Sequence, residues 1–139
     1  MAGYSSTPLP KKLGIQLGHR VLFLSAPAGF VEGLGPLGII ATSRAADDAA
    51  GVLVPQNVIV WFTSSLDALR TAFPTTAAQL HKAGGLWVAW PKRASRVPTD
   101  VTEDRVRDVA LAAGLVDNKV CAIDEVWSGL RCVYRLRDR

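Results

Sequence analysis

The chain has 139 residues, 49% hydrophobic and 20% charged, and this composition excludes a largely disordered protein. A net charge of +4 is ordinary for a small domain, so nucleic acid is not expected as a partner, although arginines gather in the last nine residues. No apolar run is long enough to span a membrane, and the polar start is unlike a signal peptide. We therefore expect a cytoplasmic protein with no membrane partner.

The N-terminal third predicts one strong element among weak ones. Residues 1–10 are expected to be loosely ordered, although a Thr-Pro pair begins a short helix that stops at Gly14. The apolar run 19–24 predicts a buried strand, and the loop 25–30 follows it. A poor helix after the loop and a weak strand over 37–42 complete this part.

The middle of the chain predicts a central strand followed by a broken helix. Residues 58–62 are β-branched, aromatic and continuously apolar, which is typical of a central strand. Ser64 or Ser65 caps the next helix, whose buried stripe includes Leu66, Leu69 and Phe73. Pro74 is expected to interrupt this helix, and a second helical segment is expected to end at Gly84.

The C-terminal part predicts a strand, a helix and a hairpin. Residues 86–90 form a buried strand that Pro91 ends. Asp100 and Glu103 have the spacing of a capping box, and Gly114 stops the helix whose buried stripe is Val106, Val109, Ala110 and Ala113. The hairpin strands are residues 119–124 and 130–136, with turn chemistry at residues 127–129.

Strands alternate with helices along the chain, which predicts an α/β fold with a mainly parallel, Rossmann-like sheet. The closing hairpin places the last strand antiparallel to the one before it. The length suits a single domain over residues 1–139.

The closing hairpin is similar to that of the S-adenosylmethionine-dependent methyltransferases, and residues 17–22, 57–60 and 80–87 resemble three of their strand approaches. The loop 25–29 departs from that family because it has no carboxylate and only one glycine. Asp47 and Asp48 are weak candidates for the acidic residue after the second strand, and the third strand is expected to be missing. Tight binding of S-adenosylmethionine, or of any other cofactor, is therefore not expected.

A second resemblance covers nearly the whole chain. Residues 3–9, 12–15, 84–92 and 114–130 resemble a bacterial family known as domain of unknown function 3052. That resemblance implies no activity, so whether the chain is an enzyme stays open.

Ligands of open parallel sheets bind beyond the carboxyl ends of the strands, which places a candidate site there. The candidate ligand-binding residues are Ser25, Pro27, Gly29, Phe30, Lys92, Arg93, Ser95 and Trp127. Lys92 and Arg93 could hold a phosphate or carboxylate, or could be solvated loop cations. Trp127 could stack on a ligand or pack in a turn. Asp124 and Glu125 could act as a base or flank the turn.

Cysteine and histidine spacing predicts no metal site. Cys121 and Cys132 are expected to be reduced thiols on strands, and His19 and His81 are expected to be structural.

Two functional hypotheses of different classes follow, with a third in reserve. The first is a non-catalytic module that binds a protein or a small anionic ligand. The alternative is a minimal enzyme, such as a transferase using a nucleotide-like cofactor of the S-adenosylmethionine type. A polyanion binder using the arginine-rich tail is the third.

Overall fold

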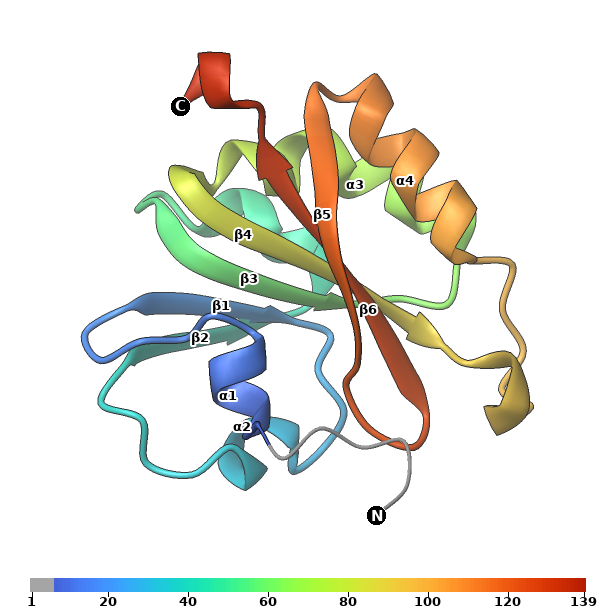
Figure 1. Cartoon of the computed structure of the whole chain (residues 1–139), viewed down its shortest axis with the longest axis horizontal. Helices are drawn as coiled ribbons and strands as arrows, with labels where there is room; N and C mark the ends of the chain where they lie inside the picture. The colour runs from blue at the N-terminus through green and yellow to red at the C-terminus, as the bar shows by residue number, and fades with distance from the viewer. Residues whose placement is uncertain (1–6) are drawn as a thin grey trace.

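The computed structural model describes residues 7–139 and is built on a six-stranded sheet in the order β2-β1-β3-β4-β6-β5 (Figure 1). Strands β1 to β4 are parallel where they pair, and β6 is antiparallel to both β4 and β5, which confirms the predicted sheet. The strands are β1 (Arg20–Leu24), β2 (Ile40–Arg44), β3 (Gln56–Phe62), β4 (Leu80–Pro91), β5 (Leu115–Ala122) and β6 (Trp127–Tyr134).

Helices lie on both sides of the sheet. Short helices α1 (Leu9–Lys12) and α2 (Phe30–Gly33) lie on one side, and the longer α3 (Leu66–Ala78) and α4 (Glu103–Ala112) lie on the other (Figure 1). The 3₁₀ turns are η1 (Ala46–Gly51), η2 (Arg93–Ser95) and η3 (Leu136–Asp138). The chain passes from β2 to β3 through η1 without a further strand, as the sequence predicted, so β2 is an edge strand.

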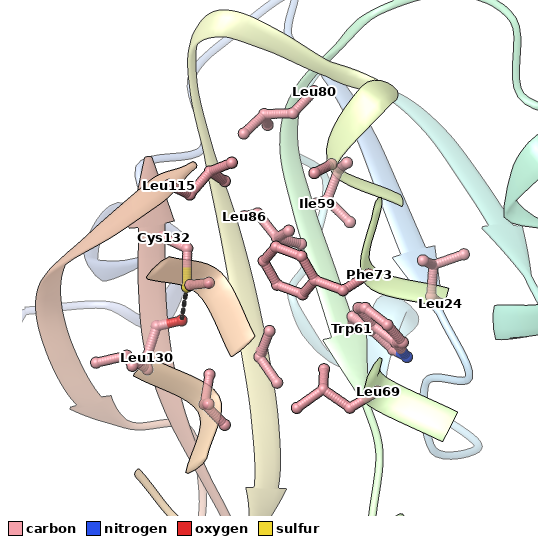
Figure 2. Packing of buried hydrophobic residues seen from close by; sticks show 14 of the residues in the cluster. Leu24, Ile59, Trp61, Leu69, Phe73, Leu80, Leu86, Leu115, Leu130 and Cys132 are labelled. Carbon is pink, nitrogen blue, oxygen red and sulfur yellow. Dashed lines mark hydrogen bonds between the residues drawn. The ribbon is translucent and has the colours of Figure 1, made fainter. Parts of the chain in front are cut away.

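The main core lies between the sheet and the pair α3 and α4. Alternate residues of the buried strands point into this core, and the residues between them point into a second cluster on the opposite face. Because both faces are covered, these strands are apolar at consecutive positions. Figure 2 shows Phe73 of α3 and Trp61 of β3 in this core, with ring centroids 6.3 Å apart. The labelled residues of Figure 2 are Leu24, Ile59, Trp61, Leu69, Phe73, Leu80, Leu86, Leu115, Leu130 and Cys132.

A second cluster covers the opposite face, and the segment after α1 is part of it. Leu13 is fully buried there, and the indole N–H of Trp87 donates to its carbonyl at 3.0 Å. The short helix predicted after the Thr-Pro pair is α1, and it places Leu13 against the sheet. Residues 1–6 lie outside the described part of the chain.

The helix after β3 continues through Pro74, so the prediction of an interruption was wrong. Proline removes one helix hydrogen bond, but Phe73 and Ala77 bury their side chains against the sheet on either side of it. The hydroxyl of Thr76 also donates to the carbonyl of Ala72 at 2.9 Å. Tertiary packing therefore outweighs the local cost of Pro74.

Residues 80–84 are the first part of β4, and the predicted second helical segment does not exist. Leu80 pairs with Gln56, and the register then shifts before Gly85 pairs with Val58. A Cβ on Gly84 would come within 3.1 Å of the His81 carbonyl oxygen and closer still to that of Asn57. Gly84 is therefore explained by close approach of backbones in the sheet and not by a helix end, whereas at Gly85 it is the Arg131 side chain that occupies the place of a Cβ.

Ser65 caps α3 as predicted, with its hydroxyl accepting from the Ala68 N–H at 3.2 Å, whereas the cap of α4 and the hairpin turn differ from the predictions. Thr102 caps α4 by accepting from the Arg105 N–H, whereas Asp100 caps α3 by accepting from the Leu66 N–H at 2.7 Å. Trp127 to Gly129 lie within β6, so the turn is made by residues 123–126. Of the predicted α4 stripe, Ala113 is exposed because it follows the helix end.

Within residues 7–139, no helix has the length and apolar character needed to cross a bilayer.

Candidate functional site

The carboxyl ends of β1 to β4 lie at one edge of the sheet, and five of the eight predicted site residues line two pockets there. The first, which we call the β1–β2 pocket, has a volume of about 450 Å³. It is lined by residues 25–29, Val31, Glu32 and residues 43–45. The second, the β4 pocket, has a volume of about 550 Å³ and is lined by residues 90–93, 96–99, 101–103 and Ser128.

Three of the predicted residues, Ser25, Pro27 and Gly29, line the β1–β2 pocket. Ser25 has a left-handed backbone with φ of 54°, and its hydroxyl accepts from the Ala46 N–H at 3.1 Å. Gly29 has φ of 81° and precedes α2, where glycine carries no steric cost. The loop shape is therefore fixed by its own backbone, and the Ser25 hydroxyl already has a partner.

A cation stands where β2 ends. Arg44 is the last residue of β2, lines the β1–β2 pocket and pairs with Asp48 at 3.0 Å. Asp47 and Asp48 lie in η1, and neither lines this pocket; Asp47 faces a separate groove between η1 and α3. The two aspartates that the sequence offered for ribose recognition are therefore not at the strand end.

Two of the predicted site residues, Phe30 and Trp127, pack against the same third ring, Phe62, at this edge of the sheet. The ring of Phe30 packs edge-on against Phe62, with centroids 4.8 Å apart, and Phe62 packs edge-on against Trp127 at 5.1 Å. Phe62 ends β3 and Trp127 begins β6 at the sheet edge. Both Phe30 and Trp127 are half-buried in this cluster, and neither lines the β1–β2 pocket or the β4 pocket.

The β4 pocket contains the predicted cations. Lys92 and Arg93 line it, and the structure adds Arg96, which sequence reasoning missed. Arg96 has a left-handed backbone with φ of 61°, a conformation that non-glycine residues rarely adopt and that clusters at functional sites. No described residue forms an ion pair with any of these three side chains. A Lys-Arg-x-x-Arg spacing was the sequence signal for the third cation.

The remaining lining of the β4 pocket is mixed. Trp90 and Val101 are buried beneath it, and Val97 and Pro98 form an apolar wall. Glu103 is the acidic residue among those that line the pocket, and its carboxylate forms an ion pair with Arg107 at 2.7 Å. The pocket is therefore positively charged with apolar walls.

Ser95 shapes the loop instead of lining the pocket. Its hydroxyl donates to the Lys92 carbonyl at 2.6 Å and accepts from the Val97 N–H at 3.2 Å. Asp124 has a similar local role, since its carboxylate accepts from the N–H groups of Val126 and Trp127 at 2.8 Å. His19 and His81 each accept a backbone N–H through Nδ1, at 3.2 and 3.1 Å.

The helix N-termini at this edge contribute little to anion binding. Side chains already cap the N–H groups of Leu66 and Ala68 in α3 and of Arg105 in α4. Helix α2 has only four residues. Side-chain cations, more than helix ends, therefore determine the charge of this edge. Across residues 7–139, no group of three or more His, Cys, Asp or Glu side chains is placed to hold a metal ion.

The fold is shared with methyltransferases of known structure. Magnesium protoporphyrin IX methyltransferase from Synechocystis PCC 6803, solved with bound SAM, is 9% identical, with a TM-score of 0.67 over 91% of this chain and 74% of its own. A SAM-dependent methyltransferase from Aquifex aeolicus is 13% identical, with a TM-score of 0.63 over 88% and 85% of the two chains. The fibrillarin pre-rRNA processing protein of Methanococcus jannaschii is 14% identical, with a TM-score of 0.63 over 95% and 70%. At these identities the likeness shows the fold alone.

The sequence itself matches one family. No curated protein matches this chain. The model of a family described as "Protein of unknown function (DUF3052)" matches residues 43–136, which is more than half of the chain and includes two of the strings that carried the resemblance, 84–92 and 114–130. The chain therefore belongs to the DUF3052 family.

Proposed function

We propose that this chain is a non-catalytic binding module whose β4 pocket holds a small anionic ligand. The observation that carries the proposal is the group Lys92, Arg93 and Arg96, three cations around one pocket with no ion-pair partner among residues 7–139. Guanidinium and ammonium groups bind phosphate and carboxylate through charge-assisted hydrogen bonds. The apolar wall of Val97 and Pro98 suits a ligand with an anionic group on an apolar or ring-containing body.

The residues of the β1–β2 pocket support the choice of a non-catalytic module, because they lack the groups that commonly hold a nucleotide-like cofactor. Its loop has one glycine, the Ser25 hydroxyl is already bonded, and Arg44 stands at the end of β2. A ribose is commonly held there by a carboxylate that accepts from its hydroxyls, and arginine cannot accept a hydrogen bond. S-adenosylmethionine is therefore not the ligand that we expect.

A minimal enzyme is the second candidate, namely a transferase using a cofactor of the S-adenosylmethionine type. The observation that favours it is the open pocket of about 450 Å³ at the ends of β1 and β2, in a fold shared with a methyltransferase solved with bound SAM. Micromolar binding of S-adenosylmethionine by calorimetry would decide for this candidate.

A thermal-shift screen followed by calorimetry tests the first proposal. The probes are AMP, ATP, S-adenosylmethionine and S-adenosylhomocysteine, and a ligand at one hundred times its Kd should stabilise the fold by about 2.7 kcal/mol. We expect a nucleotide to bind and the two sulfur compounds not to bind.

The variant Lys92→Ala with Arg93→Ala should lose nucleotide binding while its unfolding free energy stays within about 0.5 kcal/mol, because both residues lie in a loop. The matched control is Lys11→Ala with Arg137→Ala, which removes the same charge from exposed positions outside the pocket. A nucleotide that binds the Lys92 and Arg93 variant unchanged would reject the β4 pocket as its site.

A further inference from the structure

An apolar groove lies between helices α3 and α4, which stand together on one side of the sheet (Figure 1). It has a volume of about 410 Å³ and shares no residue with the β1–β2 pocket or the β4 pocket. We call it the α3–α4 groove. Its apolar lining consists of five residues, Phe73, Pro74, Val109, Ala112 and Ala113. Pro74, Ala112 and Ala113 are exposed, so the groove is open to whatever covers this pair of helices.

Two opposite charges also line the groove. Arg70 comes from α3 and Asp108 from α4, and both side chains are exposed. Within residues 7–139, neither of them forms an ion pair or a hydrogen bond, either with the other or with a third residue. Arg107, by contrast, binds three carboxylates on the far side of α4. The groove therefore presents one cation and one anion that the described fold leaves for a partner.

A large apolar side chain projects from α4 next to the groove. Leu111 is 42% exposed, whereas Val106 is fully buried and Val109 is half-buried. Leu111 follows Asp108 by three positions, so the two side chains are neighbours on the outer surface of the helix. A single exposed leucine is ordinary, but this one adjoins an exposed apolar groove that it does not itself line. The leucine and the groove together extend the apolar surface across both helices.

The groove, the leucine and the two charges are self-complementary under a two-fold rotation. In an isologous contact the same patch is used by both copies, so that each contact occurs twice. Leu111 of each copy then enters the groove of the other, and Arg70 of each copy faces Asp108 of the other. Both charges find a partner of opposite sign, and both grooves are filled.

We infer that the α3–α4 face is the contact surface between two copies of this chain. Helices of 13 and 10 residues present a smaller area than the roughly 800 Å² per partner of a standard interface, so the dimer is weak and reversible. An isologous contact closes on itself, so association stops at the dimer. The inference goes beyond the proposed function, because the groove shares no residue with the β4 pocket.

Sedimentation velocity on the full chain at low salt, from about 10 μM to about 1 mM, tests the dimer. We expect a reversible monomer–dimer equilibrium that Leu111→Ser weakens by about tenfold or more, because each dimer loses two buried leucines. The matched control is Leu53→Ser, which changes an exposed leucine in the loop before β3 and should dimerise as the wild type does. A wild type that stays monomeric at the highest concentration would overturn the inference, and so would equal dimerisation of the Leu111 variant.

Charge reversal tests whether the partner is a second copy. Arg70→Glu makes both charges of the groove negative, and Asp108→Arg makes both positive. Each variant alone should dimerise about tenfold more weakly, since like charges then meet across the two-fold axis. An equimolar mixture of the two should form a heterodimer tighter than either homodimer, because opposite charges again meet at both positions.

A mixture of Lys11→Glu with Asp108→Arg is the control for this rescue. Lys11 is exposed and lies outside the groove, so this mixture should not restore association. A mixture of the two groove variants that associates no better than each variant alone would exclude contact between Arg70 and Asp108 of different copies and overturn the inference.

NMR of the wild type across the same concentrations locates the contact. Amide chemical shifts should change with concentration along α3 and α4, and the shifts of the edge strands β2 and β5 should stay constant. Changes confined to β2 or β5 would mean that the copies associate through a sheet edge, which would reject the α3–α4 face as their interface.

Discussion

Trp61 and Trp87 are fully buried on neighbouring strands, but only one of them has a hydrogen-bond partner for its indole N–H among residues 7–139. The Trp87 indole N–H donates to the Leu13 carbonyl, whereas the Trp61 indole N–H has no partner within the described part of the chain. Both side chains are 0% exposed, so their apolar burial is alike. The hydrogen bond is therefore what distinguishes them energetically.

We predict that Trp87→Phe destabilises the protein more than Trp61→Phe, by about 1–2 kcal/mol. The first change breaks a bond and leaves the buried Leu13 carbonyl without its donor, whereas the second removes a donor that had no acceptor. Urea unfolding of both variants and the wild type measures the difference. Equal losses would mean that the Trp87 bond contributes nothing.

At the scale of elements, the loop before α4 serves two helices. Asp100 caps α3 by accepting from Leu66, and the Thr99 hydroxyl donates to the Ser64 carbonyl at 2.8 Å. Thr102, two residues on, caps α4. The start of α3 is therefore tied to a segment more than thirty residues later in the sequence.

We predict that Asp100→Ala and Thr102→Ala each cost about 1 kcal/mol, the usual contribution of an N-cap. Hydrogen exchange should separate them, because Asp100→Ala exposes the Leu66 amide and Thr102→Ala exposes the Arg105 amide. Faster exchange at the Glu103 amide in the Asp100 variant, with the Leu66 amide unchanged, would instead support the capping box that the spacing suggested.

Sequence patterns predicted the elements whose signal is local. The buried strands at 58–62 and 86–90 are uninterrupted apolar runs, and they stand as predicted within β3 and β4. Residues 80–84 were mistaken for helix because His81, Lys82 and Ala83 carry no strand preference, and pairing of Leu80 with Gln56 decides their conformation. Asp100 was assigned to the wrong helix because its partner is distant in sequence.

The candidate site was predicted only as a sheet edge. The rule for open parallel sheets placed Ser25, Gly29, Lys92 and Arg93 near strand ends, and they line pockets there. The division into two pockets depends on strand order and on the packing of Phe62, which local patterns do not encode. The pairing of Lys119 with Arg131 could not be predicted for the same reason, since it follows from strand register alone.

At the scale of the whole molecule, the two cysteine thiols differ in solvent exposure, so their reactivities measure how far the fold protects each one. Cys132 is fully buried in the main core, and burial raises its pKa to about 12 (Figure 2). Cys121 is half-exposed in β5, and burial raises its pKa as well, with Lys12 and Lys119 opposing the effect. Because the thiolate is the reactive form, labelling of either cysteine should rise with pH.

We predict that iodoacetamide at pH 8 modifies Cys121 in the folded protein and reaches Cys132 only when the protein unfolds. Mass spectrometry of the wild type and of Cys121→Ser, with and without urea, measures both rates. Native labelling of Cys132 as fast as that of Cys121 would show that the core opens locally around β6.

The loss of an outer strand leaves β2 as a potential template for aggregation, because an exposed edge can pair with another chain. That edge extends over five residues and ends in a charged arginine, Arg44. At the other edge, β5 carries a register shift between Asp117 and Lys119 and exposes a lysine. Short length, a bulge and positive charge are devices by which proteins prevent edge-to-edge polymerisation. We therefore expect the protein to stay dispersed at high concentration. A variant with a longer and uncharged β2 should lose this protection against edge-to-edge pairing.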